Sequence, residues 1–238
     1  MSNHNIFYIP PQFFRAGQVT IEGAYLSHIK NVLRKRTGEQ ITLTDGHGYR
    51  YGAELCDVRR GKTTAKIVHK KLMPRKCSLE ITVGFAPVKG LRNDSIIEKG
   101  TELGVTGFVV FDSEHAVVRD VGAQKVERWK KIAQSAMIQS QQYYLPDVIC
   151  ALSIDDILQI GQSYDSILVS DPGGRSEVPH GARKILLLIG PEGGLSESET
   201  DFLLKGGASF MSLGPNRLRS ETAAIVGVSK ILAEYGLI

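Results

Sequence analysis

The sequence predicts an α/β protein in two parts: a small β-barrel followed by a parallel sheet with helices outside it. Residues 1–72 contain short alternating segments separated by turn signals, a pattern typical of a small β-barrel. From Ser78 onward, apolar strand segments alternate with helical periodicities, which indicates a parallel sheet. We therefore expect a barrel over residues 1–72, a linker over 73–77 and an α/β domain over 78–238.

The expected barrel strands are short. They cover residues 6–9, 40–44, 49–58 and 63–69. The sequence Asp45-Gly46-His47-Gly48 is a turn signal between the second and third of them. One helix is expected over residues 24–34, because Leu26, Ile29, Val32 and Leu33 recur at helical spacing. Its end is basic, and cations also suit the C-terminal end of a helix dipole.

In the second part, strands and helices are expected in alternation. The strands cover residues 79–86, 108–111, 166–169, 185–189 and 210–214, and the helices cover 93–103, 124–142, 155–160 and 223–235. A further helix is expected to begin at Ser196, because Glu199 stands three residues later and completes a capping box.

Two of these strands end in glycine-containing loops. Five aliphatic residues, 185–189, run into Gly190-Pro191-Glu192-Gly193-Gly194, and the strand at 210–214 runs into a polar loop over 215–222. Ligands of open α/β sheets bind at the carboxyl ends of strands, where glycines allow close approach of the backbone. We interpret the pair as the two walls of a pocket. Taken alone, the first loop is equally compatible with a simple tight turn.

Charge is distributed unevenly along the chain. The net charge is +4, but residues 1–76 carry 14 Lys and Arg against 5 Asp and Glu, whereas the remainder carries 15 against 20. A basic first third favours a polyanion partner, with nucleic acid the first candidate, although a solvated basic face without a partner gives the same pattern. The absence of a signal sequence or a long apolar run, together with three scattered cysteines, leads us to expect a cytoplasmic protein.

Several familiar chemistries lack their motifs. Gly61-Lys62-Thr63 has Cys56 where a phosphate-binding loop needs glycine, and no dinucleotide fingerprint or hydrolase elbow is present. The six histidines never stand at metal-ligand spacing, so we expect no metal.

Four blocks of sequence resemble the RsmE family, small-subunit ribosomal RNA methyltransferases of the SPOUT class that methylate N3 of a uridine. They are residues 28–34 with 45–48; Lys89 and Arg92 through 98–105; 127–132 through 139–140; and 189–194 paired with 213–214 and 218–223. The blocks follow the family's order over nearly the whole chain. Gln141 and Gln142 stand where the family often has arginine.

The resemblance implies a PUA-like barrel that holds RNA and a SPOUT domain whose last segment threads a trefoil knot. It also implies a homodimer and S-adenosyl-L-methionine as cofactor. The residues expected at the cofactor are Leu188, Ile189, Gly190, Pro191, Glu192, Gly193, Leu213, Gly214, Leu218, Thr222 and Ala223. Those expected at RNA are Lys30, Arg34, Lys35, Arg36, Arg59, Arg60, Lys62 and Arg92.

Two residues are expected to be catalytic. N3 of uridine must lose a proton before it attacks, and the resulting charge spreads onto O2 and O4, so a nearby cation favours the anion. Arg219 is the candidate cation and Glu221 the candidate base or orienting group. Glu221 equally suits the first turn of a helix, and a phosphate contact is the less favoured alternative for Arg219.

Two other functions compete with this interpretation. One is a non-catalytic ribosome-assembly factor that binds RNA through the barrel. The other is a SPOUT methyltransferase acting on another RNA, such as transfer RNA.

Overall fold

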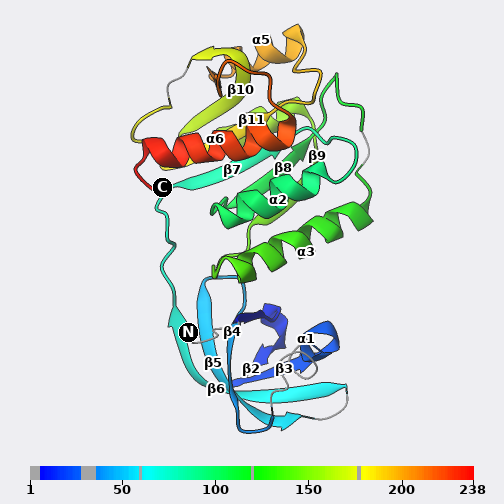
Figure 1. The fold of residues 1–238 in the computed structure, drawn as a ribbon, viewed down its shortest axis with the longest axis vertical. Coiled ribbons are helices and arrows are strands. Elements are labelled where there is room, and N and C mark those ends of the chain that lie inside the picture. The colour runs from blue at the N-terminus through cyan, green and yellow to red at the C-terminus, as the bar shows by residue number, and fades with distance from the viewer. Residues whose placement is uncertain (1–5, 28–35, 59–60, 119–120, 176–177) are drawn as a thin grey trace. The chain divides into compact units, whose positions relative to one another are not determined.

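The computed structural model describes residues 6–27, 36–58, 61–118, 121–175 and 178–238. The chain forms two compact units (Figure 1). One comprises Met1–Arg75 with Met137–Leu145, and the other comprises Lys76–Ala136 with Pro146–Ile238. No helix in the described ranges is long and apolar enough to cross a membrane.

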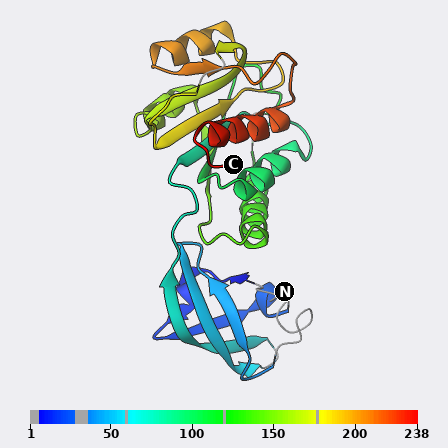
Figure 2. The ribbon, with the colours of Figure 1, turned by 60° about the vertical axis from the view of Figure 1, so that its left-hand side comes forward.

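The first unit is a six-stranded sheet that curves around one apolar core (Figure 2). Its elements are β1 (Ile6–Tyr8), η1 (Pro11–Phe13), β2 (Phe14–Arg15), β3 (Gln18–Glu22), α1 (Gly23–Ser27), β4 (Gln40–Thr44), β5 (Tyr49–Val58) and β6 (Lys62–Leu72). The strand order is β1-β4-β5-β6-β3-β2, antiparallel except for the β1–β4 pair. The core faces of the strands supply side chains such as Ile21, Leu43 and Leu55, all fully buried.

Residues 143–145 belong to this first unit because they bond to its β4–β5 turn. The Gly48 amide donates to the Tyr143 carbonyl (2.8 Å), and the Leu145 amide donates to the Gly46 carbonyl (2.8 Å). The Tyr144 ring lies so close to Gly48 that an added Cβ would be 2.3 Å from it. A side chain at residue 48 would therefore displace the segment.

The second unit is a six-stranded, fully parallel sheet between two layers of helices (Figures 1 and 2). Its elements are β7 (Glu80–Phe85), α2 (Arg92–Glu102), β8 (Gly107–Phe111), α3 (Ala123–Gln139), β9 (Asp147–Leu152), α4 (Ile154–Gly161), β10 (Ser166–Arg175), β11 (Lys184–Ile189), α5 (Glu197–Lys205), β12 (Ser209–Met211) and α6 (Ser220–Glu234). The strand order is β12-β10-β11-β7-β8-β9, with β11 near the centre. The predicted α/β class and parallel sheet are confirmed.

Alternation along β11 divides the core into two layers. Leu186 and Leu188 share a cluster with Ile157 of α4 and Leu203 of α5. Leu187 points to the opposite face, where an added Cβ at Gly227 of α6 would come within 2.9 Å of it. Because both faces are covered, the strand is apolar and buried from Ile185 to Ile189, after the exposed Lys184 at its start, as expected for a parallel sheet.

Several expected boundaries were wrong. Helix α6 begins at Ser220, so three residues expected in a polar loop form its first turn. Strands β3 and β9 were not predicted, and β10 runs on to Arg175 rather than ending at Val169. The predicted helix over residues 24–34 falls mostly outside the described residues; its described part is α1.

Candidate active site

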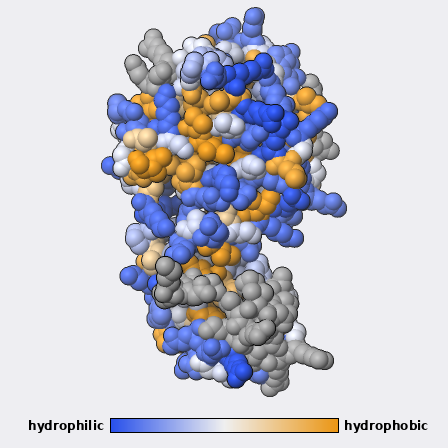
Figure 3. Space-filling model, in the orientation of Figure 1, coloured by the Kyte–Doolittle hydropathy of each residue, from blue (hydrophilic) through white to orange (hydrophobic). Residues whose placement is uncertain are grey.

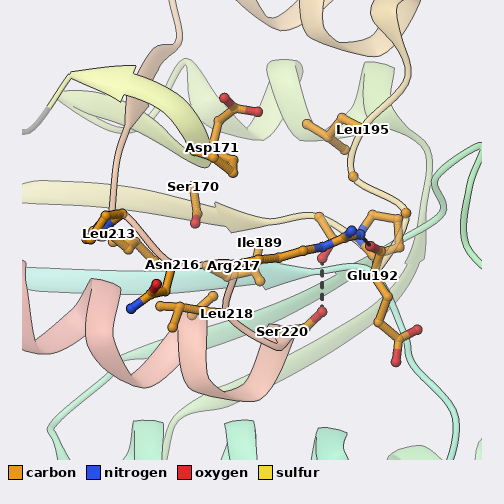
Figure 4. Close-up of a pocket in the computed structure, with 18 residues that line it drawn as sticks. Ser170, Asp171, Ile189, Glu192, Leu195, Leu213, Asn216, Arg217, Leu218 and Ser220 are labelled. Carbon is orange, nitrogen blue, oxygen red and sulfur yellow. Dashed lines mark hydrogen bonds between the residues drawn. The ribbon is translucent and has the colours of Figure 1, made fainter.

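A cavity of about 430 Å³ opens in the second unit at the carboxyl ends of β11 and β12, beside the part of β10 where its pairing with β11 ends (Figure 4). Three stretches of chain line it. They are Ser170, Asp171 and Pro172; Ile189, Gly190, Pro191, Glu192, Gly193, Gly194 and Leu195; and Leu213, Gly214, Pro215, Asn216, Arg217, Leu218, Ser220 and Ala223. The site thus lies where open α/β sheets bind ligands, and its volume suits a small organic molecule.

The loop after β11 is held in a tight turn. The Gly194 amide donates to the Pro191 carbonyl (2.9 Å), and Gly194 has a φ of 78°. The loop then enters α5 through the predicted capping box. The Ser196 hydroxyl accepts from the Glu199 amide, and the Glu199 carboxylate accepts from the Ser196 amide (2.8 Å). This prediction is confirmed.

Glu199 also ties this loop to the segment that follows β8. Glu199 is 8% exposed, and its carboxylate accepts from the Ser113 hydroxyl (3.1 Å) and the Glu114 amide (2.9 Å). A buried charge needs such partners, and here they are mostly fixed backbone donors. These bonds fix the start of α5 and thereby hold the preceding loop, which forms one wall of the cavity, in place.

The loop after β12 meets the loop after β11 directly. The Arg217 guanidinium donates to the Glu192 carbonyl, and the Ser220 hydroxyl donates to the Gly190 carbonyl (3.2 Å; dashed in Figure 4). Gly214 has a φ of 131°, in the region that side chains with a Cβ rarely adopt. The structure thus brings the two glycine-containing loops into one cavity.

Most residues expected at a cofactor line this cavity. They are Ile189, Gly190, Pro191, Glu192, Gly193, Leu213, Gly214, Leu218 and Ala223. Leu188 is fully buried in the sheet beneath it, and Thr222 is exposed on α6; neither lines it.

The two residues expected to be catalytic stand at the start of α6, beside the lining residues Ser220 and Ala223. Arg219 is the exposed N-cap residue, and Glu221 is half-buried in the first turn. Neither lines the cavity itself. The Glu221 Oε2 atom is buried and has no hydrogen-bond partner among the described residues.

Glu192 contributes its backbone to the cavity, but its carboxylate points away from Ser170, Leu213 and Asn216 (Figure 4). The carboxylate pairs with the Arg92 guanidinium, at the start of α2. The side chains of Arg92 and Glu192 are 37% and 42% exposed. This ion pair joins the loop after β11 to the helix that follows the neighbouring strand β7.

The start of α2 is itself fixed by the two residues after Arg92. Asn93 is fully buried and bonds both to the Val88 amide (3.0 Å) and to the Val88 carbonyl (2.7 Å). Asp94 accepts from the Trp129 indole (3.0 Å) and from Arg128. Because these bonds fix the start of α2, Arg92 is held in a defined position beside the loop that follows β11.

Sequence reasoning singled out only Glu192 among the six polar side chains that line the cavity and missed the other five. Ser170 and Asp171 lie in β10, directly after the strand predicted over residues 166–169, and the polar, glycine-containing stretch 170–174 is the same signal that identified the other two loops. Asn216, Arg217 and Ser220 lay inside the loop that was identified but were not singled out.

Five of the eight cations expected to contact RNA lie outside the described residues. They are Lys30, Arg34, Lys35, Arg59 and Arg60. Arg36 and Lys62 are exposed in the first unit, and the Arg36 amide donates to Glu39. Within the described ranges, no group of His, Cys, Asp or Glu side chains is arranged to hold a metal ion.

Comparison with known proteins covers nearly the whole chain. Residues 75–232 match the family description of an RNA methyltransferase domain, and residues 21–68 match that of an RNA methyltransferase PUA domain. The chain is 33% identical over 235 residues to ribosomal RNA small subunit methyltransferase E of Bacillus subtilis, covering 92% of this chain and 91% of that protein. The corresponding Synechocystis protein is 28% identical over 233 residues, covering 94% of this chain and 76% of that protein.

A solved structure shares the same fold. It is a crystal structure of a ribosomal RNA small subunit methyltransferase E from Neisseria gonorrhoeae bound to S-adenosyl methionine. The TM-score is 0.85 at 28% identity, and the match covers 98% of each chain.

Proposed function

This chain belongs to the ribosomal RNA small subunit methyltransferase E family, and from that premise we propose that it methylates N3 of a specific uridine in small-subunit (16S) ribosomal RNA. S-adenosyl-L-methionine is the proposed methyl donor. The observation that carries the proposal is the cavity formed beside three neighbouring strands.

The cavity suits this donor in size and in lining. Its volume of about 430 Å³ lies within the range of small-molecule sites. Leu213 and Leu218 offer apolar contacts for an adenine ring, and Asp171 offers a carboxylate to a hydroxyl or ammonium group. The sulfonium, when bound, supplies an activated methyl carbon; the chain's own residues have to align the acceptor and manage its proton.

Glu221 is the proposed proton acceptor and Arg219 the proposed anion stabiliser. Glu221 Oε2 is buried and has no hydrogen-bond partner among the described residues, which costs folding free energy. This oxygen is therefore available to accept a proton from the substrate. The proton of N3 passes to this carboxylate, N3 then bonds to the methyl carbon, and the pair of the breaking C–S bond returns to sulfur. Arg219 offers its guanidinium to O2 or O4, where the negative charge of the uridine anion gathers.

Arg92 is the proposed contact to the target nucleotide, and Glu192 positions it. A guanidinium has five N–H donors, and the bond to Glu192 uses an N–H on Nη1. Four donors therefore remain for a phosphate or a base oxygen. On this account Glu192 does not bind the donor's ribose through its side chain.

Several further properties follow from the family rather than from the geometry. We propose that the first unit holds RNA with Lys30, Arg34, Lys35, Arg36, Arg59, Arg60 and Lys62, and that the segment after β12 threads a trefoil knot. We also propose a cytoplasmic homodimer. Exposed apolar side chains on the second unit, among them Leu91 and Val117 (69% and 63% exposed), are compatible with a covered face. Figure 3 shows apolar groups on the visible side of the second unit.

The deciding experiment offers radiolabelled methyl donor to the protein with small-subunit particles, free 16S ribosomal RNA and transfer RNA in parallel. Incorporation into 16S RNA, mapped to N3 of one uridine, supports the proposal. Incorporation into transfer RNA alone identifies another substrate. No incorporation together with no heat of donor binding by calorimetry points to a non-catalytic assembly factor.

A further inference from the structure

Strand β6 continues beyond its pairing with β3, whereas β5 stays paired with β4 over residues 50–54. Strand β3 pairs with β6 only over Lys62–Lys66, whereas the β5–β6 ladder runs on to Leu72. A register shift after Gly52 leaves Val68 as an extra, exposed residue at the junction. We call the part beyond it, residues 49–52 and 69–72, the distal ribbon.

The two faces of the distal ribbon differ. Tyr51 is buried, with its ring 4.4 Å from that of Phe14, so Tyr51 marks the core face. Lys70, its cross-strand partner, lies on the same face, with its ammonium 3.7 Å from the centre of the Tyr49 ring. Because side chains alternate along a strand, Arg50 and Lys71 occupy the opposite face.

That opposite face carries cations placed against one another. Arg50 and Lys71 are direct cross-strand partners. Like charges in this position destabilise a sheet. His69 lies two residues from Lys71 on the same face, over Gly52, where an added Cβ would be 2.2 Å from its ring.

Among the described residues, no carboxylate forms an ion pair with Arg50 or Lys71. The proximal half of the same ladder is built differently, because Lys66 stands opposite Glu54. The uncompensated pair is thus confined to the distal ribbon. The repulsion between Arg50 and Lys71 destabilises the sheet, and no carboxylate among the described residues offsets it. An anion from another molecule, bound between the two side chains, would offset it.

We propose that Arg50, Lys71 and His69 form a phosphate-binding face for the RNA backbone, a contact in addition to those expected from the sequence. The proposal rests on the proposed function for the nature of its partner. Side chains two residues apart on a strand are about 7 Å apart, so they reach successive backbone groups rather than one small anion. The other positions of this face are Gly52 and, on β4, Thr42 and Thr44, so it offers no large apolar side chain to insert into a lipid surface.

The test compares two lysines of one strand in the full-length protein. In vitro transcribed 16S ribosomal RNA is titrated by fluorescence anisotropy at several salt concentrations. Each lost phosphate contact lowers the slope of log affinity against log salt by about 0.7–0.9. We expect this change for Lys71→Ala, about twice this change for Arg50→Ala with Lys71→Ala, and none for the control Lys66→Ala.

Thermal unfolding of the same variants separates binding from folding. Removing one cation of a like-charged pair leaves the melting temperature of Lys71→Ala unchanged or higher while RNA affinity falls. A lower melting temperature with an unchanged salt slope assigns Lys71 a structural role and overturns the proposal. Equal slopes for Lys71→Ala and Lys66→Ala overturn it as well.

Two further arms separate the alternatives. Vesicles of phosphatidylserine and phosphatidylcholine are titrated in parallel, and binding to them that depends on Lys71, without a matching effect on RNA, overturns the RNA assignment. If wild-type protein fails to bind 16S RNA at all, both this inference and the proposed function fall. If it binds and methylates that RNA but Lys71 has no effect, the inference alone fails.

Discussion

Exchanging Glu192 for glutamine separates two roles for this residue, positioning Arg92 or binding the methyl donor. The substitution keeps the shape of the side chain and removes the charge that holds Arg92. We expect kcat/KM for RNA to fall while the donor's Kd changes by less than about twofold. The backbone of Glu192, which lines the cavity and accepts from Arg217, stays in place.

The magnitude follows from the exposure of the pair. The side chains are 37% and 42% exposed, so water screens their attraction. Half-exposed ion pairs of this kind are worth about 0.2–1 kcal/mol, which corresponds to a factor of about 1.4–5 in kcat/KM. Arg92→Ala removes the nucleotide contact itself, and a charge-assisted hydrogen bond of about 1.5 kcal/mol corresponds to about tenfold.

The assay is a double-mutant cycle read in two ways. Methyl transfer to 16S RNA gives kcat/KM for Arg92→Ala, Glu192→Gln and the double variant, and calorimetry gives the donor's Kd. If Glu192 acts through Arg92, the double variant is no slower than Arg92→Ala alone. Multiplicative losses, or a tenfold weaker donor in Glu192→Gln with no such change in Arg92→Ala, would refute the positioning role.

Three other predictions test the structure around the cavity. Gly214→Ala forces a φ of 131° on a residue with a Cβ, so calorimetry should show that donor binding is about tenfold weaker. The control is Gly122→Ala, at a site without a positive φ and with equally open space, which should leave donor binding unchanged. Glu199→Gln turns an amide toward backbone N–H donors and should lower the free energy of unfolding in urea by about 2 kcal/mol, and a loss below 0.5 kcal/mol would contradict the assigned bonds. The backbone amides of Arg183 and Lys184 hold the pKa of Asp165 below its ordinary value of 3.8; the folded state thus favours the carboxylate, and the stability it contributes is lost as pH falls below about 4. Asp165→Asn should therefore flatten the acid side of the melting-temperature profile, and an identical profile would count against the assignment.

The sequence predicts the second unit well where strands are apolar on both faces. Strand β11 is aliphatic from Ile185 to Ile189 because α4 and α5 cover one face and α6 covers the other. Strand β9 was missed although residues 148–152 are all apolar, because so short a run does not by itself distinguish a strand from a segment of a buried helix. The strand lies at the sheet edge, where Ile149 is 49% exposed.

The candidate site was predictable as far as glycine-ended strands reveal it. The start of α6 was placed too late because its N-cap, Arg219, makes no capping bond through its side chain, so the usual polar signal is missing. The role of Arg92 as the partner of Glu192 was not predictable either. The two residues are far apart in sequence, and only the pairing of β7 with β11 brings their loops together.

The bonds of residues 143–145 to the β4–β5 turn decide how the protein can be divided. The chain leaves the first unit after Arg75, returns at Met137 and leaves again after Leu145. A fragment cut at residue 75 would lose the strip that accepts from Gly48 and donates to Gly46. The N-terminal unit therefore cannot be excised or grafted intact by cutting the chain at a single point.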